Sequence, residues 1–535
     1  MQKSAAALLT GIMLFCSFPP FEYHVFAWIA LVPLIYLCFS CKPGESFLYG
    51  LLSGAVFWLA SIFWLTHVSY IGWMFISLYC AVYVAGFAAV VSWWIGNFHK
   101  AGPDCMEGKP HGRQPRFSPQ NCHIFQWNDL IFILGIPAIW VGIEYARSHF
   151  LTGFPWNLLG VSQYSCARLI QCADLGGVYL VSYLLIMGNT VFALLIYHRR
   201  KGVLKPAIGL AAFLLILFLT LEYGKWRMVR SSEKLETIRT AAIQCNVPQQ
   251  LKWSEEWADD ICRRLKEATE EACRAAPLDL IVWPETALPD YVRFSGPSRT
   301  LLNDSLRHGV PILVGSMDIE KLPGKTNYFN SSLLFFPGQG GPQAYAKRHL
   351  VFFGEYVPFG DYLPFLRSIA GVEDITPGTE NVVFRFDGGN KKFSVLICFE
   401  DTLPYLAREC VKAGARLLIN QTNDAWFDPS WASRQHMTHC IFRCVENRVA
   451  CLRSTNTGTT CLIDRFGIVR STLLPLQGSC GDPEFLLAAA SFSPGKMPLT
   501  FYTRHGDIFA IACAAFSLPI FFGVLLGLLR KRTTW

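Results

Sequence analysis

The sequence predicts an α-helical integral membrane domain of eight helices joined to an α/β domain. Three observations support this fold class. Hydrophobic residues make up 52% of the 535 residues and charged residues only 16%, whereas charged residues make up about 25% of a typical soluble domain. Long apolar runs fill the first 222 residues and recur near the end of the chain. Between them, short apolar runs alternate with amphipathic helical patterns, which is typical of α/β domains.

Eight apolar runs approach the length of about 20 residues that a helix needs to cross a bilayer. The first run is similar to the apolar core of a signal peptide, but it lacks a small-residue cleavage site and another apolar run follows at once. We therefore expect it to be a retained helix. The eight runs lie near residues 4–18, 24–40, 46–66, 72–97, 129–146, 174–198, 203–222 and 507–529.

Basic residues in the connecting segments predict the orientation of these helices, because cytoplasmic loops carry an excess of Lys and Arg. If the N-terminus is inside, the loops near 66–72 and 147–173 lie outside, and they are poor in basic residues. Both termini are therefore expected to be cytoplasmic. Each of the cytoplasmic segments contains Lys or Arg; these segments are 41–45, 98–128, 198–201 and 530–532.

This orientation divides the chain into three parts. Residues 1–222 form seven transmembrane helices, residues 223–505 form one large domain on the outer side, and residues 506–535 form the eighth helix with a basic cytoplasmic tail. The segment 100–128 is rich in Pro, Gly and polar residues, so we expect a flexible loop. The net charge of +8 fits basic flanks of membrane helices, and without a dense Lys/Arg face it indicates no nucleic-acid partner.

The outer domain contains short β-like runs separated by helical patterns, among them 253–275 and 431–449. This alternation predicts a layered α/β domain with buried strands. The strand-like runs are 238–244, 278–284, 310–316, 330–336, 392–398, 415–421 and 461–467.

Four residues with catalytic potential lie at the ends of such runs or in a turn-rich segment between them. LIVWPETALP places Glu285 after an apolar run, AYAKRHLVFFGEYVP contains Lys347 and Glu355, and SVLICFED places Cys398 at a strand end. Functional groups of α/β proteins gather at the carboxyl ends of strands. A thiol attacks only as a thiolate, so Glu285 could take its proton and Lys347 could stabilise an oxyanion. Taken singly, the cysteine could be a small core residue and the others ordinary surface residues.

Together and in this order, these residues resemble the Glu–Lys–Cys triad of the nitrilase superfamily, which folds as an αββα sandwich. WPE at 283–285, YAKRHL around Lys347 and LICFED around Cys398 carry the resemblance. With membrane helices on both sides of the domain, the whole chain resembles the apolipoprotein N-acyltransferase family. Further motifs agree: GFPWNLLGVSQY at 153–164, NVPQQLKW at 246–253, FGEYVP at 353–358, NDAWF at 423–427 and ENRVACLRSTNTGTT at 446–460.

Three positions depart from the family pattern. Phe352 stands where the family commonly has proline, Phe399 stands where it commonly has tyrosine, and residues 433–440 match its helix only approximately. These changes spare the triad, so they bear on substrate preference rather than on the chemistry.

The resemblance implies a two-step acyl transfer. In the first step Cys398 attacks an ester of a phospholipid such as phosphatidylethanolamine, with Glu285 as general base, and forms a thioester. In the second step the α-amino group of a diacylglyceryl-cysteine lipoprotein takes the acyl chain. Lys347 and the backbone N–H of Phe399 are expected to hold the oxyanion in both steps.

Other residues are expected to support this chemistry. Glu355 and Glu400 would position Lys347 and the thiol, although Glu400 can equally be interpreted as a simple salt-bridge partner. Trp156, Trp253 and Trp426 are candidates for a lipid entrance, because tryptophan favours the membrane interface; ordinary interfacial anchoring is the alternative for each of them.

The resemblance also implies a bacterial inner-membrane protein with a periplasmic catalytic domain, in contact with membrane lipids and without a cofactor. Nineteen cysteines are scattered without paired CxxC clusters, which argues against a zinc site. An oxidising compartment would permit disulfides, but a disulfide on Cys398 would be incompatible with the mechanism. Glu144, an acid within the predicted helix 129–146, is either functional or, because it lies near the helix end, interfacial.

Two rival functions remain open at this level. A membrane-anchored nitrilase-type amidase would pass its acyl group to water, although one anchor would suffice for a soluble substrate. A transporter or receptor would use the outer domain only to bind a ligand, but the membrane helices have few central charges of the kind that mark ion pathways.

Overall fold

The computed structural model describes residues 2–100, 124–200, 207–229, 235–352, 354–357, 375–473, 482–492 and 498–532. The chain forms two compact units. The first, here called the helical unit, is Met1–Arg227 with Asp507–Trp535, and the second, the α/β unit, is Met228–Gly506. Most of the expected loop at 100–128 lies outside the described residues.

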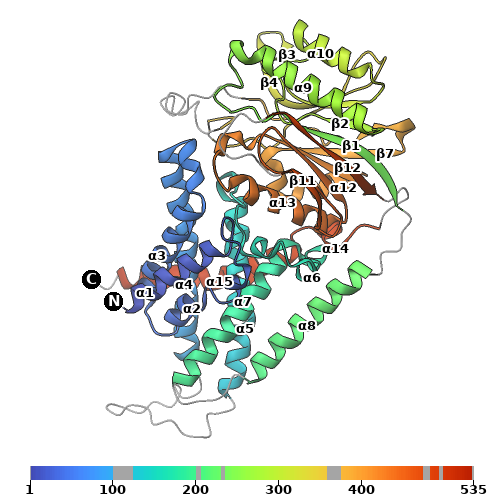
Figure 1. Ribbon diagram of the computed structural model, residues 1–535. Coiled ribbons are helices and arrows are strands. Elements are labelled where there is room, and N and C mark those ends of the chain that lie inside the picture. The colour runs from blue at the N-terminus through green and yellow to red at the C-terminus, as the bar shows by residue number, and fades with distance from the viewer. Residues whose placement is uncertain are drawn as a thin grey trace, which may run out of the picture. The chain divides into compact units, whose positions relative to one another are not determined.

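The helical unit consists of apolar helices of unequal length (Figure 1). Its main helices are α1 Gln2–Cys16, α2 Val32–Cys38, α3 Pro43–Ser61, α4 Tyr70–Lys100, α5 Ile124–His149, α7 Ala173–Arg200, α8 Ala207–Val229 and α15 Ile508–Arg532. Short turns of helix connect them: η1 His24–Trp28, η2 Phe63–His67, η5 Phe150–Thr152, η6 Leu159–Gln163 and α6 Ala167–Ile170.

Each predicted apolar run overlaps one of these helices, but the helices differ in their ability to cross a bilayer. Among the described residues, four helical segments are long and apolar enough: Tyr70–Phe98, Asp129–His149, Ala173–Arg199 and Ile208–Val229. The helices at 2–16, 24–38 and 508–524 are shorter. A membrane helical region is therefore confirmed, and the number of eight spans remains a prediction.

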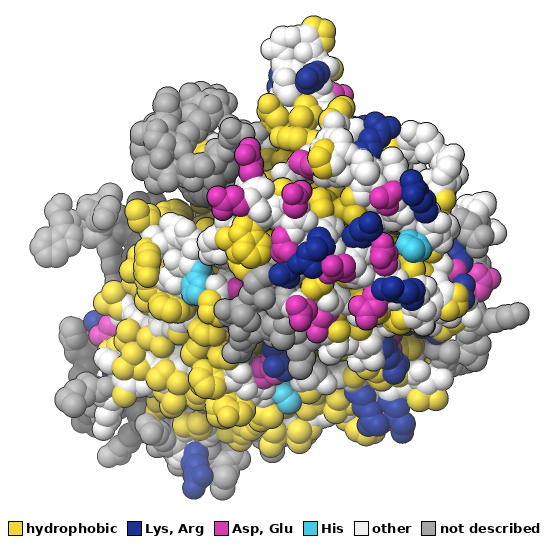
Figure 2. Space-filling model, turned by 45° about the horizontal axis from the view of Figure 1, so that its top comes forward, with side chains coloured by type: hydrophobic (Ala, Val, Ile, Leu, Met, Phe, Trp, Pro, Cys, Tyr) yellow, Lys and Arg dark blue, Asp and Glu magenta, His cyan; other side chains and the backbone are white. Residues whose placement is uncertain are grey.

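The exposed face of α8 shows why the helical unit belongs in a lipid environment. Leu214, Leu215, Phe218 and Leu219 are each more than half exposed, and their spacing places them along one stripe of the helix. Figure 2 shows that apolar side chains gather into a broad area with few charges. Contiguous apolar surface of this kind marks sites of contact with membranes or other proteins, so it is suited to contact with lipid tails.

The α/β unit contains two six-stranded sheets. The first sheet has the order β12-β1-β2-β3-β4-β5 and the second has the order β11-β10-β9-β8-β7-β6. In the first sheet the strands are β1 Glu236–Gln244, β2 Leu280–Val282, β3 Ile312–Leu322, β4 Lys325–Phe335, β5 Gln343–Ala346 and β12 Glu484–Phe492. In the second they are β6 Phe384–Phe386, β7 Lys391–Ile397, β8 Leu417–Thr422, β9 Ala450–Thr455, β10 Thr460–Ile463 and β11 Val469–Leu473.

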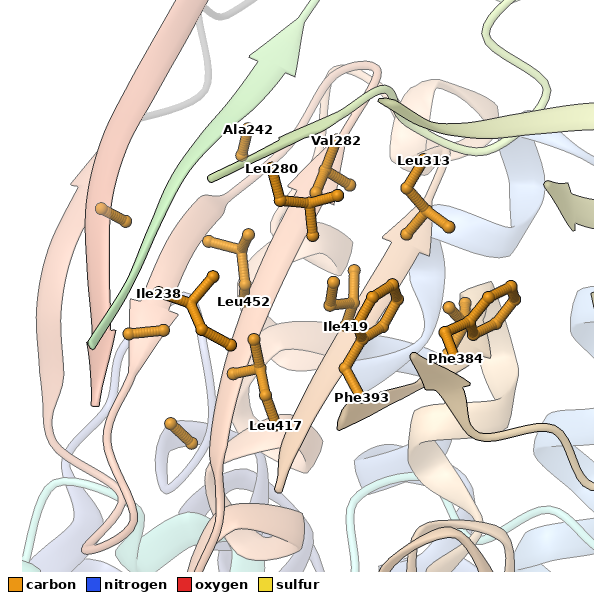
Figure 3. Packing of buried hydrophobic residues seen from close by; sticks show 14 of the residues in the cluster. Ile238, Ala242, Leu280, Val282, Leu313, Phe384, Phe393, Leu417, Ile419 and Leu452 are labelled. Atoms are coloured by element: carbon orange, nitrogen blue, oxygen red, sulfur yellow. The ribbon is translucent and has the colours of Figure 1, made fainter. Parts of the chain in front are cut away.

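The two sheets pack face to face and bury one apolar core between them (Figure 3). Ile238 and Leu280 of the first sheet and Leu417, Ile419 and Leu452 of the second belong to this core. The central strands β1, β2 and β3 are parallel, as are β7, β8 and β9. Parallel strands that are buried on both faces usually consist of continuous apolar runs. This explains why most of these central strands were predicted from the sequence.

Helices cover the outer face of each sheet, so the unit has four layers. On the first sheet lie α9 Glu255–Ala275 and α10 Gly296–Leu306; α9 buries Ile261, Leu265, Ala268 and Ala272, spaced by four, three and four residues. This spacing is the apolar stripe of an amphipathic helix. The second sheet packs against α12 Pro404–Lys412 and α13 Ala432–Asn447. The layers agree with the expected αββα arrangement.

Each of the seven predicted strands overlaps an observed strand, with ends that differ by up to six residues, and five observed strands were not predicted from the sequence: β5, β6, β9, β11 and β12. β9 is fully buried but contains Arg453, which interrupts the apolar pattern. β12 is recognisable only through its antiparallel pairing with β1, more than 200 residues earlier in the chain. Long-range pairing therefore overrides the local pattern at these strands.

Candidate active site

Cys398 follows β7 directly and begins the short helix η8 Cys398–Thr402. Its φ angle is +50°, in the left-handed region that costs a non-glycine residue about 1–2 kcal/mol. The residue as a whole is partly exposed, and its thiol forms no disulfide. Burial of the sulfur and the nearby Glu285 carboxylate raise the pKa of this thiol, while Lys347 opposes the shift. The resting group is therefore a neutral thiol that needs a base.

Glu285 lies three residues beyond the end of β2 and is 6% exposed. The side-chain amide of Asn330, on β4, donates a hydrogen bond of 2.8 Å to Glu285 Oε1. Two residues earlier, the backbone carbonyl of Trp283 accepts a hydrogen bond of 2.6 Å from Gln421 Nε2, near the end of β8. The Gln421 bond joins the two sheets, so the structure brings Glu285 to the same edge as the strands that carry Cys398.

Lys347 follows β5 and is almost completely buried, at 1% exposure. Its Nζ lies 3.7 Å from Glu285 Oε1 and 2.8 Å from Glu355 Oε2. Burial alone would lower the pKa of Lys347, but the carboxylates of Glu355 and Glu285 outweigh it and raise the pKa. The lysine is thus a fixed cation, which is the property an oxyanion stabiliser requires.

Glu355 holds Lys347 in place. Besides its ion pair with that lysine, it accepts hydrogen bonds from Asn330 Nδ2 at 3.0 Å and from the Val351 backbone at 2.8 Å. Asn330 therefore bridges Glu285 and Glu355 on the two sides of the lysine. This geometry agrees with the positioning role expected for Glu355, and that role remains a proposal.

Glu400 is fully buried and acts as an acceptor for several donors. It receives the hydroxyl of Tyr345 at 2.8 and 2.9 Å, and backbone N–H groups of Arg348, His349 and Ile397 at 2.7 to 3.0 Å. Burial raises the pKa of this carboxyl group. Through these hydrogen bonds Glu400 connects the segment after β5 to the turn that carries Cys398. Its contacts are therefore more extensive than those of a single salt bridge.

Two further residues at the site were missed by the sequence analysis. Asn330 gave no local signal, because its role depends on two distant carboxylates. Lys252 is 2% exposed, and its Nζ donates to the backbone carbonyl of Glu285 at 3.0 Å. Burial lowers the pKa of Lys252 to about 8, and the carboxylate of Glu285 and the thiol of Cys398 oppose this shift. Lys252 lies in the motif NVPQQLKW, and this was the sequence feature that could have identified it as a site residue.

The three tryptophans are placed differently. Trp253 and Trp426 belong to the α/β unit and are 50% and 48% exposed. Trp156 belongs to the helical unit and is buried, with its ring centroid 5.2 Å from that of Trp64. Phe399 stacks on His349 at 6.1 Å between ring centroids. The lipid-entrance role of the tryptophans and the oxyanion role of the Phe399 N–H remain predictions.

Glu144 is buried inside the helical unit. It is 3% exposed, and its Oε1 accepts the backbone N–H of Leu159 at 2.7 Å. One helical turn later, Arg147 donates to the carbonyls of Phe154 and Trp156 at 2.6 and 2.8 Å. Both charged residues therefore hold the segment that contains the GFPW motif. Among the described residues, no group of three or more His, Cys, Asp or Glu has the arrangement of a metal site.

Comparisons with known proteins agree with this two-part architecture. Residues 10–191 match a family model described as the apolipoprotein N-acyltransferase N-terminal domain, and residues 239–476 match one described as carbon-nitrogen hydrolase. Among solved structures, Saccharomyces cerevisiae Nit3, of the nitrilase superfamily, is 18% identical and covers 48% of this chain and 91% of its own, with a TM-score of 0.36. That likeness is too low to support an argument.

Relatives along the full length are more informative. A protein of Geobacter metallireducens named apolipoprotein N-acyltransferase is 33% identical, and the match covers 95% of this chain and 92% of the relative. Proteins of the same name from Chlorobaculum tepidum and Treponema denticola are 28% and 27% identical; the matches cover 98% and 95% of this chain, and 96% and 93% of those proteins. The chain belongs to the apolipoprotein N-acyltransferase family.

Proposed function

We propose that this protein N-acylates lipoproteins in the bacterial inner membrane, using a phospholipid as acyl donor and a Glu285–Lys347–Cys398 triad. The observation that carries the proposal is the buried Lys347, which lies 3.7 Å from Glu285 and 2.8 Å from Glu355 and interacts electrostatically with Cys398, a cysteine without a disulfide. A cation, a carboxylate base and a thiol together can form and break an acyl thioester. Membership of the family directs this chemistry to lipoproteins.

In the first step the thiol loses its proton to Glu285 as its sulfur attacks the ester carbonyl of a phospholipid. The raised pKa of the thiol means that little thiolate exists at rest, so proton transfer and attack are coupled. The oxyanion lies against Lys347 Nζ and the N–H of Phe399. The ester C–O bond then breaks, and Glu285 returns the proton to the oxygen of the departing lysophospholipid.

In the second step the free α-amino group of a diacylglyceryl-cysteine attacks the thioester on Cys398. The new C–N bond forms, and Glu285 takes a proton from the amine. When the C–S bond breaks, that proton passes to the sulfur, which restores the thiol. The same oxyanion donors serve both steps, because each step passes through a tetrahedral intermediate at the same carbon. Phosphatidylethanolamine is the donor that we propose for the first step.

The proposed arrangement in the membrane follows the basic loops of the sequence. Residues 1–222 form seven spanning helices, residues 223–505 the periplasmic catalytic domain, and residues 506–535 the eighth helix and a cytoplasmic tail. The described helices that are long and apolar enough for a bilayer support this proposal. A domain on the outer side would meet phospholipid and lipoprotein at the same surface.

Hydrolysis is the second candidate function. The match of residues 239–476 to the carbon-nitrogen hydrolase model favours it, because water in place of the amine would release a free acid from the same thioester. The two functions differ in the acceptor, and therefore in what happens when an acyl donor is supplied without an amine.

The test is mass spectrometry of the purified full-length protein after incubation with phosphatidylethanolamine and no acceptor. We expect an acyl adduct on Cys398 that disappears when a diacylglyceryl-cysteine peptide is added. Cys398→Ala should abolish the adduct, whereas Cys410→Ala, the same change at a buried cysteine of α12, should retain it. An unmodified Cys398 with intact phospholipid, in a protein that hydrolyses amides, would replace the proposal by the second candidate.

A further inference from the structure

A second cluster of charged side chains lies within the α/β unit, in contact with the turn that carries Cys398. It consists of Asp401 on η8, Asp424 on η9 Asp424–Phe427, His436 on α13 and Arg453 on β9. None of these side chains is more than 2% exposed. Burying four such groups is costly unless their charges balance. The protonation state of His436 decides whether the charges of this cluster balance.

His436 joins the two carboxylates of this cluster. Its Nδ1 lies 2.8 Å from Asp424 Oδ1 and its Nε2 lies 2.9 Å from Asp401 Oδ1. A carboxylate can only accept, so both ring nitrogens must carry a proton for both contacts to be hydrogen bonds. Arg453 Nη2 lies 2.9 Å from Nδ1, and its positive charge disfavours a proton on that nitrogen. The two carboxylates favour the protonated ring, and together they outweigh this single cation.

The guanidinium of Arg453 completes the balance. It donates to Asp401 Oδ2 at 3.0 Å and to Asp424 Oδ2 at 2.7 Å. With His436 as an imidazolium, two negative charges face two positive ones. With a neutral imidazole, one uncompensated negative charge would remain beside the nucleophile.

The remaining groups around His436 do not alter this count. Arg443 of α13 donates to the carbonyls of Asp401 and Thr402 and is paired with Glu446 at 2.8 Å. Burial lowers the pKa of His439 to about 3, so that ring is neutral. The thiol of Cys440 lies 3.0 Å from Asp401 Oδ2, and burial raises its pKa, so it is neutral as well.

The cluster reaches the nucleophile by two routes. Arg453 Nη1 donates to Asn420 Oδ1 at 2.7 Å, and Asn420 Nδ2 donates in turn to the carbonyl of Cys398 at 3.2 Å. These bonds hold the left-handed turn at Cys398. The second route is electrostatic, because the carboxylate of Asp424 contributes to raising the pKa of the Cys398 thiol.

We propose that His436 is a positioning residue for the nucleophile: its imidazolium neutralises Asp424 and Asp401, which lowers the cost of forming the Cys398 thiolate. The inference rests on the proposed role of Cys398 as nucleophile. It is independent of the lipid substrates, since the reactivity of the thiol can be measured without them.

The experiment measures how fast iodoacetamide alkylates Cys398 at a fixed pH in the purified full-length protein, followed by mass spectrometry of the Cys398 peptide. His436→Gln keeps a polar side chain and removes the positive charge. A nearby uncompensated carboxylate shifts a pKa by about one unit or more, so we expect alkylation about tenfold slower. His439→Gln, a change at a neutral buried imidazole on the same helix, should leave the rate unchanged.

A double variant separates charge from packing. Adding Asp424→Asn to His436→Gln removes the uncompensated carboxylate, so the rate should return to within about threefold of the parent. A purely structural role predicts a double variant no faster than His436→Gln, and that result would overturn the proposal. Asp424→Asn alone should accelerate alkylation; an unchanged or slower rate would overturn it even if His436→Gln does not fold. Acyl transfer could fail for other reasons without affecting these rates.

Discussion

Replacing Glu355 by Gln tests how the structure prepares Lys347 for catalysis. In the parent, Lys347 Nζ lies 2.8 Å from Glu355 Oε2 and 3.7 Å from Glu285 Oε1. Glu355→Gln keeps the size of the side chain and its hydrogen bond to Asn330, but removes the nearer negative charge. Lys347 is 1% exposed and cannot turn to water, so it should move toward Glu285.

That movement has two consequences for the first acylation step. The ammonium leaves the position that we propose for the oxyanion, and it pairs with Glu285, the proposed base for the thiol proton. Loss of an oxyanion donor typically lowers the rate by about 10²–10³-fold, or about 2.7–4 kcal/mol in activation free energy. We expect a fall of about 100-fold for Glu355→Gln, because the lysine is displaced rather than removed. The free energy of unfolding should fall by about 1–3 kcal/mol, the cost of weakening a buried charge-assisted bond.

The assay is single-turnover acylation of Cys398 by phosphatidylethanolamine, with iodoacetamide alkylation of the same thiol as a parallel readout. Acylation should be slow in Glu355→Gln while alkylation persists, because the thiol itself is intact. The matched control is Glu409→Gln, which breaks a 2.8 Å pair with Arg348 at a site where Glu409 is 41% exposed; such pairs contribute about 0–1 kcal/mol. Parental acylation in Glu355→Gln would refute the positioning role, and loss of both reactions would indicate a collapsed site instead.

Three further predictions concern stability and charge. Lys252→Met should raise the melting temperature at pH 7 while slowing acylation. The folded state lowers the pKa of Lys252 from 10.5 to about 8, so below pH 8 it disfavours the charged lysine by up to about 3 kcal/mol. An unchanged melting temperature would contradict this prediction. The folded state raises the pKa of His436 from 6.5 to about 9, so its stabilising contribution is complete below pH 6.5 and is lost as pH rises to 9. The difference in unfolding free energy between the parent and His436→Gln should therefore shrink over that window, and a constant difference would argue against an imidazolium. Ile419→Ala should destabilise the α/β unit by about 2–5 kcal/mol, because Ile419 is fully buried between the sheets, whereas Leu487→Ala, at 38% exposure, should cost far less in the same denaturant titration.

The candidate site illustrates how far local patterns reach. Glu285 and Cys398 were recognisable because each follows an apolar run, and the ends of parallel strands in packed sheets meet at shared edges. Lys252 and Asn330 were not, since a lysine after a turn and an asparagine in a strand have no distinctive local pattern. Their roles depend on bonds to Glu285, which lies 33 and 45 residues away.

The charge cluster shows the same limit more strongly. In the sequence, Arg453 interrupts the apolar run of its strand, and for that reason β9 was not predicted. In the fold, the charge of the arginine is paired with those of Asp401 and Asp424, which come from two other elements 52 and 29 residues earlier. A buried charge is tolerated only where partners converge on it, and convergence is a property of the tertiary structure.

The sequence by itself determined the division into apolar helices and an α/β region, and the central strands, because hydrophobic periodicity acts over short stretches of chain. Its motifs also supplied the residues of the proposed triad. Only the tertiary structure decided the outer strand pairings, the environment of Lys347 between two carboxylates, the inward placement of Glu144 and the cluster around His436. These features depend on burial and on distances between segments far apart in the chain. Charge burial and hydrogen bonding are therefore decided only when those segments pack together.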